Sequence, residues 1–499
     1  DIVFNYDGAS SGTVIDSNVN VNLNGEGSFW TGNTKAEWNN GNEGKPDADK
    51  MQVSHMTLQV ENGAQWNPTS VKEVGNNSAS AGSQAVALNS LKLNNGVVNL
   101  DSDKLGTNSP VKVEKISGNG TITTNSLDNK LVIDEKVAGT KLKVEGSGEI
   151  GDKILAGKAT LEELAGTAKV GDKTASDEVG TQDGIIAGKM SAKVGDDGKI
   201  VASTVKRAIQ QHNQAVSSMA NLSLMTWRQE NNDMNKRLGE VRASEGSQGI
   251  WARMARGQSK YGQQGIKNQY NYYQLGYDSK ISDDWILGGA FTYTDGDSNY
   301  TNGSGTNKHT GFAVYGSNLR DDGSFIDLIA KYAHMKNDFD VNGGVGSGDY
   351  STNGLSFSAE YGKRFHQEGY WIEPQAELTY GRVSSADFTT KNGASVHQDS
   401  MDSLVGRLGF SLGKDIKQGN VYVRASYLYD FQGDTSVTMS KGGAATSFKT
   451  DLGGGWWEFG VGTNLDLGHD THFYLDVETT AGGDVDTPWQ WNAGVRYSF

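Results

Sequence analysis

The chain has 499 residues, more than one hydrophobic core usually serves, so we expect at least two structural units. Only 35% of the residues are apolar, no run of 18 apolar residues occurs and cysteine is absent, which excludes a transmembrane helix, a disulfide framework and a thiolate metal site. The net charge of −15 argues against nucleic acid as a partner. A transmembrane β-barrel is not excluded by these numbers, because its apolar residues alternate with polar ones and leave little hydropathy signal.

Residues 1–153 carry short strands separated by glycine and asparagine. The first residues, DIVFNYDGAS, lack a basic and then apolar leader, so we expect a mature or truncated chain. LQVENGAQW, LNSLKLNNGVVNL, ISGNGTITTN and NKLVIDEKVAGTKLKV alternate apolar and polar residues, as half-buried strands do. Their spacing favours a coil of parallel rungs, with an ordinary β-sandwich as the alternative. They resemble the C-terminal end of an autotransporter passenger, where an autochaperone region caps a parallel β-helix.

Residues 154–203 show no clean period and are interpreted as a connecting segment. Residues 204–242 predict a long helix, because apolar residues recur at helical intervals without proline. Six polar residues, Arg228 to Asp233, interrupt that pattern, which suits a polar lumen better than a soluble core. At about 1.5 Å per residue the segment spans roughly 50–60 Å, longer than a bilayer core of roughly 30 Å. It could plug a barrel from end to end; the other interpretation is a solvated linker helix.

Residues 245–499 predict a barrel of twelve strands from their longer, aromatic-rich alternation. The connections alternate in length, which is typical of an outer-membrane barrel with its long loops outside the cell. The predicted strands are 249–258, 270–281, 285–295, 308–319, 323–335, 354–366, 370–383, 402–415, 420–431, 455–468, 471–481 and 490–499. The short turns are 282–284, 320–322, 367–369, 416–419 and 469–470, and the long loops are 296–307, 336–353, 384–401 and 432–454.

The charged residues of three strands share one face. In SFIDLIAKY the even positions are apolar, whereas Asp327 and Lys331 lie on the other face. GLSFSAEYGKRFH and WIEPQAELTYG repeat this arrangement with Glu360, Glu373 and Glu377. Carboxylates facing lipid would be costly, so we expect these side chains to point into a water-lined lumen.

The chain ends in WNAGVRYSF, in which Gly494, Tyr497 and Phe499 match the signal by which outer-membrane barrels are recognised for insertion. With MNKRLGEVR, FIDLIAKYAH, YWIEPQAELTYGRV and LVGRLGFSLGK, this ending resembles the β-domain of self-cleaving autotransporters, particularly the secreted serine-protease group of enteric bacteria, over about residues 226–499. The resemblance implies an all-β fold: a 12-stranded transmembrane antiparallel barrel with a lumen-plugging α-helix, preceded by the end of a parallel β-helix passenger. It also implies outer-membrane lipid, the barrel-assembly machinery and periplasmic chaperones as partners.

The family's self-cleavage suggests a role for the asparagine pair. An Asn side-chain amide can attack its own main-chain carbonyl, form a succinimide and expel the next residue, if orientation and a general base assist. The resemblance puts the cleaved residue at Asn232, before Asp233, with Asn231 as the alternative register. It makes Asp327 the base. Glu360 and Glu377 would share a proton.

The same carboxylates have a structural interpretation, because they could simply pair with Lys236, Arg237, Arg407 and Arg424. No Gly-x-Ser-x-Gly nucleophile occurs, so no protease activity on other substrates is inferred, and no cofactor or metal is expected. We therefore predict a translocator that delivers its N-terminal passenger to the cell surface. The alternative is a surface-retained adhesin whose uncleaved passenger binds host or neighbouring cells; a porin-like channel is disfavoured, because the helix would block the lumen.

Overall fold

The structure is a computed structural model that describes residues 1–6, 17–39, 55–71, 81–101, 105, 110–208, 210–241, 247–262, 264–341 and 347–499, without the side chains of 81, 211 and 232–241. It divides into two compact units. The first comprises Asp1–Gln210 with Gly442–Ala445, and the second comprises Gln211–Lys441 with Thr446–Phe499.

The first unit is built on a ladder of parallel strands. Its rungs are β2 (Asn18–Asn24), β3 (Phe29–Thr31), β5 (His55–Glu61), β6 (Gln65–Asn67), β8 (Leu88–Leu100), β9 (Val111–Thr124), β10 (Leu131–Lys136) and β11 (Lys141–Gly146). The pairs β2–β5, β5–β8 and β8–β9 are all parallel, which confirms the β-helix and rules out a sandwich of hairpins. Apolar side chains stack in register through the coil: Leu58 is paired with Leu91 and Leu91 with Ile116, and all three are fully buried.

Asparagine forms the corners of the coil. Asn62 and Asn95 have φ values of 52° and 56°, a region that asparagine tolerates better than most residues. Asn62 donates to the Asn24 side chain at 3.0 Å, and Asn119 donates to that of Asn95 at 2.6 Å. Successive turns are thus linked outside the apolar stack, which explains why this half of the sequence is rich in asparagine.

Residues 154–203 have secondary structure that extends the rungs. β12 (Ala168–Val170) pairs parallel with β10, and β14 (Glu178–Thr181) pairs parallel with β11. The remaining elements of the unit are the sheet β1 (Ile2–Asn5), β4 (Thr34–Asn39) and β7 (Ala81–Ala85), helices α3 (Gly148–Leu155), α4 (Leu161–Ala165) and η3 (Ala202–Thr204), and strands β13 (Lys173–Thr174), β15 (Met190–Lys193) and β16 (Lys206–Arg207).

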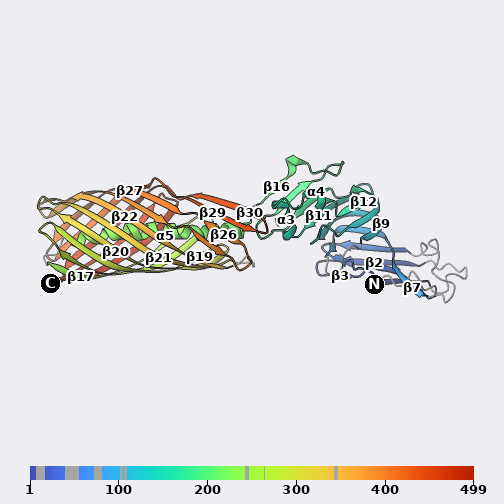
Figure 1. Cartoon of the computed structure of the whole chain (residues 1–499), viewed down its shortest axis with the longest axis horizontal. Coiled ribbons are helices and arrows are strands. Elements are labelled where there is room, and N and C mark those ends of the chain that lie inside the picture. Colours follow the sequence, from blue (N-terminus) through green and yellow to red (C-terminus); the bar gives the residue numbers. More distant parts are fainter. Residues whose placement is uncertain are drawn as a thin grey trace. The chain divides into compact units, whose positions relative to one another are not determined.

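The second unit is a closed antiparallel barrel of twelve long strands, as predicted (Figure 1). Each long strand pairs with both neighbours, and the β17–β33 pair joins the beginning and the end of the barrel sequence. The strands are β17 (Gln248–Tyr261), β18 (Ile266–Lys280), β19 (Trp285–Tyr300), β20 (Gly303–Leu319), β21 (Ser324–Val341), β22 (Gly348–Lys363), β24 (Tyr370–Val383), β27 (Met401–Ile416), β28 (Gly419–Asp430), β31 (Gly454–Asp466), β32 (Thr471–Ala481) and β33 (Val485–Ser498), with the short β23 (Phe365–Gln367) leading into β24.

The two faces of the barrel have the predicted polarity. On β21, Asp327 and Lys331 are buried at 1% and 2% exposure, whereas Leu328 and Tyr332 on the other face are 45% and 38% exposed. Because apolar side chains form the outer surface and charged ones line the interior, the barrel is inverted relative to a soluble one.

All four predicted long loops contain strand. In 336–353, β21 continues to Val341 and β22 begins at Gly348, and residues 342–346 lie outside the described ones. The turn between β19 and β20 is confined to 301–302, so the prediction of a loop over 296–307 was wrong. Its polar residues lie on both faces of the strands: Ser298 and Asn307 are almost fully buried in the lumen, whereas Asp297 and Asn299 are exposed on the outer face. Strands that are polar on both faces therefore imitate a loop in sequence. The segments 384–401 and 432–454 contain β25 (Ala386–Thr389), β26 (Ser395–Gln398), β29 (Asp434–Lys441) and β30 (Ala444–Asp451), which form one four-stranded sheet.

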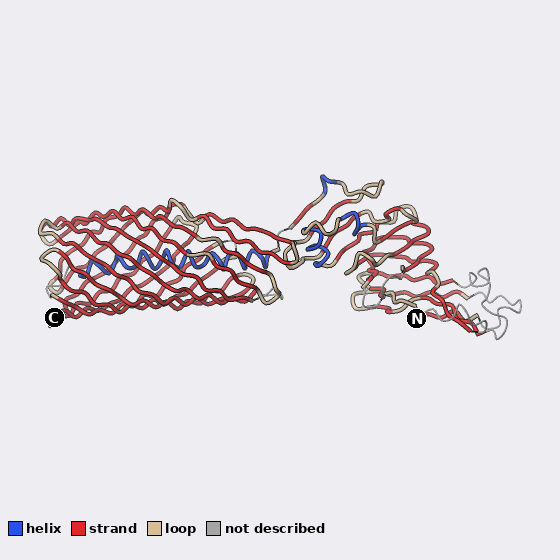
Figure 2. The backbone as a smooth tube through the Cα atoms, viewed as in Figure 1, coloured by secondary structure: helices blue, strands red, loops and turns tan. Residues whose placement is uncertain are grey.

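The long helix is α5 (Gln211–Val241), and it runs inside the barrel (Figure 2). It begins at Gln211 rather than at 204, because residues 202–207 form η3 and β16 instead. Within the part of the chain that the structure describes, no helix is long and apolar enough to cross a membrane.

Candidate functional site

The lumen with its helix is the candidate functional site. The N-terminal half of α5 is packed on all sides, because its apolar residues are buried around the whole helix. These residues are Ala215, Val216, Met219, Ala220, Leu222, Leu224, Met225 and Trp227. Trp227 Nε1 donates to the Leu355 carbonyl at 3.2 Å, and its ring lies 2.6 Å from where a Cβ at Gly354 would be. This half of the helix therefore fills the section of the lumen that it occupies.

Tyr350 of β22 contacts both the helix α5 and the four-stranded sheet of β25, β26, β29 and β30. Its hydroxyl donates to the Met219 carbonyl at 3.0 Å and lies 2.9 Å from the Ser223 Oγ. Its ring stacks on that of Phe388 in β25, with centroids 4.9 Å apart. The N-terminal half of α5 thus lies at the barrel end that carries the sheet of β25, β26, β29 and β30.

Glu230 of α5 is held by three neighbouring strands. Its carboxylate lies 2.5 Å from His309 Nδ1 and accepts from the Thr294 hydroxyl at 2.7 Å. Lys331 Nζ is 3.4 Å from the carboxylate and donates to the Glu230 main-chain carbonyl at 3.1 Å and to the Tyr272 hydroxyl at 2.8 Å. All these side chains are buried, so the ion pair acts with little solvent screening.

Arg228 of α5 forms an ion pair of the opposite polarity with another part of the barrel wall. Its guanidinium pairs with Asp430 of β28 at 3.1 Å, donates to the Leu452 carbonyl at 2.8 Å and lies 4.9 Å from the centre of the Trp456 ring. Asp430 is also bound by the Ser403 hydroxyl at 2.5 Å and the Leu404 amide at 2.9 Å. Two residues along a helix are about 200° apart, so Arg228 and Glu230 fix both the depth and the rotation of α5.

The three predicted acids lie in one lateral row of the barrel wall. Register pairs join Asp327 to Glu360, Glu360 to Glu377, and Glu377 to Arg407. Asp327 accepts from the Ser317 hydroxyl at 2.5 Å. Arg407 is bound to Glu377 at 2.7 Å and to Glu360 at 3.2 Å, so its charge is shared between the two glutamates. Arg407 was expected only as a structural partner, and that pairing is present.

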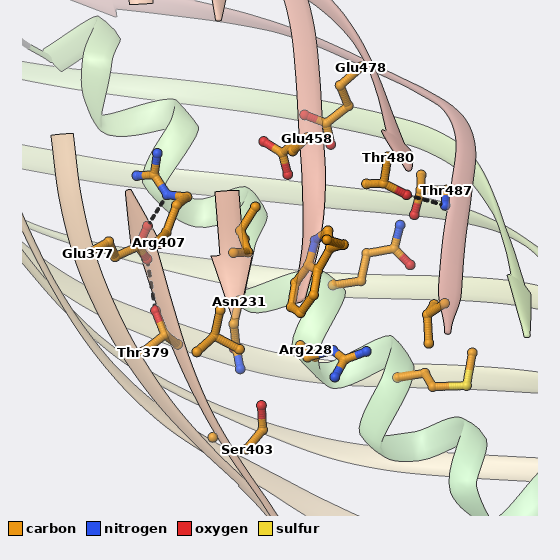
Figure 3. Close-up of a pocket in the computed structure, with 17 residues that line it drawn as sticks. Arg228, Asn231, Glu377, Thr379, Ser403, Arg407, Glu458, Glu478, Thr480 and Thr487 are labelled. Carbon is orange, nitrogen blue, oxygen red and sulfur yellow. Dashed lines mark hydrogen bonds and ion pairs between the residues drawn. The ribbon is translucent and has the colours of Figure 1, made fainter. Parts of the chain in front are cut away.

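Asn231 is in contact with the wall. Its Oδ1 accepts from the Ser356 hydroxyl at 2.8 Å, and Gly381 leaves room for its amide. A cavity of about 70 Å³ joins Asn231 to Glu377 and Arg407 along the helix (Figure 3). The side chain of Asn232, the predicted cleavage residue, lies outside the described residues, as do those of Lys236 and Arg237.

The acid row lies further along the wall than Asn231. Ser356 and Glu360 are four residues apart on β22, which corresponds to about 13 Å. Along β21, Asn337 contacts Ser223 and Lys331 contacts Glu230. Later residues of α5 therefore lie beside earlier residues of β21, in the direction of Asp327. The level of the acid row is therefore reached by the part of α5 that follows Asn231.

Arg424, expected as a partner of the three predicted acids, pairs instead with Asp476 at 3.2 Å and with Glu478. Sequence reasoning missed those two acids and the pair of Arg496 with Asp278 at 2.7 Å, so the wall holds its own ion network. Polar residues at alternate strand positions indicated which face they occupy, but nothing in the sequence indicates which partners meet across the lumen.

Of the three residues predicted to form the C-terminal signal, Gly494 and Tyr497 lie in the closing strand β33 and Phe499 directly follows it. Tyr497 and Phe499 face outward with exposures of 47% and 56%, and their rings are 6.0 Å apart. Gly494 faces the lumen against Tyr474: a Cβ there would lie 2.1 Å from the tyrosine ring. Glycine is therefore required at 494 for the β32–β33 contact.

Comparison with known proteins gives the family. Residues 250–478 match the model of the autotransporter beta-domain. These residues are an autotransporter β-domain. The chain is 33% identical to the pertactin autotransporter of Bordetella parapertussis over 56% of its own length and 32% of that protein, and 34% identical to the serine protease Pet autotransporter of Escherichia coli over 54% and 22%. It thus spans about a third or less of these curated relatives.

Among solved structures, the beta domain of the Bordetella autotransporter BrkA is similar, with 26% identity, 51% of this chain and 100% of that chain covered, and a TM-score of 0.42. Autotransporter β-domains are outer-membrane barrels, so the family match confirms both the predicted family and the predicted location of the barrel in the outer membrane.

Proposed function

We propose that this chain is the translocator unit of an autotransporter and carries its N-terminal β-helix to the cell surface. The observation that carries this proposal is α5 inside a closed barrel, sealed on all sides along its N-terminal half. A segment in that position was either drawn through the barrel or enclosed as the barrel formed. A lumen filled in this way argues against a free channel.

The direction of α5 supports delivery outward. Its N-terminal half lies at the end with the extended hairpins, and an outer-membrane barrel directs its longer connections to the outside. The chain before α5 therefore leaves the barrel at the cell surface. No nucleotide site is required, because folding of the stacked rungs outside the cell can supply the free energy.

Protease accessibility in intact cells tests delivery. We express the chain behind a secretion signal in a Gram-negative host and add proteinase K to the cells. We expect residues 1–210 to be degraded and the barrel to be protected. A passenger that is cut only after the outer membrane is permeabilised would contradict the proposal.

Assembly of the barrel would use periplasmic chaperones and the barrel-assembly machinery. The support is that β33 is the strand that closes the barrel, with the exposed aromatic rings of Tyr497 and Phe499 on its outer face. Phe499→Ala should reduce the amount of folded barrel in the membrane, measured by its heat-dependent mobility on gels. Purified Phe499→Ala chain should still refold in detergent, which separates recognition from stability.

We propose further that the passenger is released by cleavage inside the barrel. The Nδ2 atom of Asn232 would attack its own carbonyl carbon, the bond to Asp233 would break, and the departing nitrogen would take up a proton to become a free amine. Asp327 would act as the base through water, because the acid row lies further along the wall than Asn231, with Glu360 and Glu377 beside it. The support is that these acids are buried in one lateral row toward which α5 continues.

The mass of the barrel fragment distinguishes the alternatives. Cleavage after Asn232 gives residues 233–499, and the alternative register after Asn231 gives residues 232–499. Asn232→Gln should abolish the first product, and Asp327→Asn should abolish either. A wild-type protein that stays full length in its own outer membrane would refute cleavage and leave the surface-retained adhesin as the function.

A further inference from the structure

One register row on the outer face of the barrel carries three cations, with the neutral Asn271 and one carboxylate, Asp295, between Arg256 and the lysines. Register pairs join Arg256 to Asn271, Asn271 to Asp295, Asp295 to Lys308, and Lys308 to Lys336. The row therefore crosses five consecutive strands, β17 to β21. The side chains of Arg256, Lys308 and Lys336 are exposed on the lipid-facing side.

The row borders the apolar belt. Tyr273 and Tyr293 lie two positions closer to the membrane centre than Asn271 and Asp295 of the row, and their rings stack with centroids 6.4 Å apart. Phe312 of β20 and Tyr332 of β21 lie four positions closer to the membrane centre than Lys308 and Lys336, and their ring centroids are 5.8 Å apart. With strands tilted by about 40°, four residues correspond to roughly 10 Å along the barrel axis. Lys308 and Lys336 thus lie at headgroup level, above the aromatic rings that mark the interface. Because a register row runs perpendicular to the tilted strands, Arg256, three strands away, differs from Lys308 in depth by roughly 9 Å.

These cations have no partner within the described chain. Arg256, Lys308 and Lys336 make no ion pair or side-chain hydrogen bond with any described residue, although Lys308 and Lys336 lie directly opposite each other. Like charges in that position destabilise a sheet unless an anion lies between them. At the other end of the barrel, by contrast, Lys363 pairs with Asp322 at 2.8 Å and Arg364 with Glu373 at 2.7 Å.

The next row outward is acidic. Register pairs join Asp297 to Thr306, Thr306 to Asp338, and Asp338 to Asp349. These carboxylates would repel a phosphate at their own level. A phosphorylated headgroup is therefore restricted in depth to the basic row below them.

We propose that Arg256, Lys308 and Lys336 bind the phosphate groups of the phosphorylated glycolipid in the outer leaflet of the membrane. The adjacent lysines form one phosphate site, and Arg256, three strands or about 14 Å away along the inclined row, forms a second at a different depth. A disaccharide lipid with a phosphate at each end, as in lipid A, matches this pair of sites better than a headgroup with one phosphate. The proposal depends on the outer-membrane location of the barrel and not on passenger delivery or cleavage.

Native mass spectrometry of the purified full chain in detergent tests the proposal, with bisphosphorylated lipid A, dephosphorylated lipid A and phosphatidylglycerol as probes. Each charge removed should weaken lipid A binding roughly fivefold, and the triple variant Arg256→Gln, Lys308→Gln, Lys336→Gln should weaken it roughly 100-fold. The matched control is Lys363→Gln with Lys414→Gln, two cations at the opposite end, which should leave the affinity unchanged.

Three results would overturn the proposal: equal lipid A binding by the triple variant, equal binding of the dephosphorylated lipid, or equal binding of phosphatidylglycerol. Heat-dependent gel mobility checks that each variant is folded. Should the triple variant fail to fold, Lys336→Gln alone carries the test, and an unchanged affinity for lipid A would then refute the proposal.

Discussion

The charge on Glu230 should hold α5 in the lumen, and Glu230→Gln removes that charge while keeping the size of the side chain. The amide oxygen of the variant can still accept from Thr294, but Lys331 loses the carboxylate at 3.4 Å while remaining buried. Removing one partner of a buried ion pair typically costs about 3–5 kcal/mol. Lys331 keeps its contacts with the Tyr272 hydroxyl and the main-chain carbonyl of residue 230, so we expect about 3 kcal/mol.

Amide hydrogen exchange measures this effect directly. Opening of α5 exposes its amides, and about 3 kcal/mol corresponds to roughly 100-fold faster exchange in peptides from residues 215–231. Lys331→Met should accelerate exchange by itself. Amide exchange in the double variant should be slower than the sum of the two single effects predicts, with a coupling free energy of about 2 kcal/mol. The reason is that the double variant leaves no unpaired buried charge.

The matched control is Lys363→Met. This is the same substitution in a pair with Asp322 whose side chains are 32% and 59% exposed, and exposed pairs contribute less than about 1 kcal/mol. Exchange in α5 should not change. If Glu230→Gln leaves exchange within threefold of the wild type, or if the effects of the double variant add fully, the ion pair does not hold the helix.

Three further predictions concern other parts of the chain. Leu91→Ala removes a fully buried side chain from the stack of rungs and should destabilise the first unit by about 3 kcal/mol, measured by urea-dependent proteolysis; a loss below about 1 kcal/mol would contradict the stack. Burial favours the neutral form of Asp177, but its hydrogen bonds, above all the one from Lys136, hold its pKa below the usual range. The charged side chain therefore stabilises the first unit fully above about pH 5, and this stabilisation is lost as the pH falls below about 4. Asp177→Asn should therefore flatten the acid dependence of amide exchange in residues 141–146, and an unchanged pH profile would refute this role. Gly494→Val would collide with Tyr474 and should abolish the heat-dependent gel mobility of the folded barrel, whereas normal mobility would show that the wall can adjust.

Alternation in the sequence was enough to predict the architecture. Strand polarity gave twelve strands and the inward direction of Asp327, Glu360 and Glu377, because a membrane permits few charges on its lipid face. The loops were less predictable. Residues such as Ser298 and Asn307 belong to strands whose inner face is wet, and their polarity has the same appearance as that of a surface turn.

The sequence by itself determined that residues 1–153 stack as rungs, that a barrel follows and that a long helix stands between them, since each depends on a period that side-chain polarity records locally. Only the tertiary structure decided that Glu230 meets His309 and Lys331, that Arg228 meets Asp430, and that Arg407 lies between two glutamates. These contacts depend on the depth and rotation of the helix and on the register of strands far apart in the chain. Such quantities result from packing the whole barrel, and no short stretch of residues encodes them.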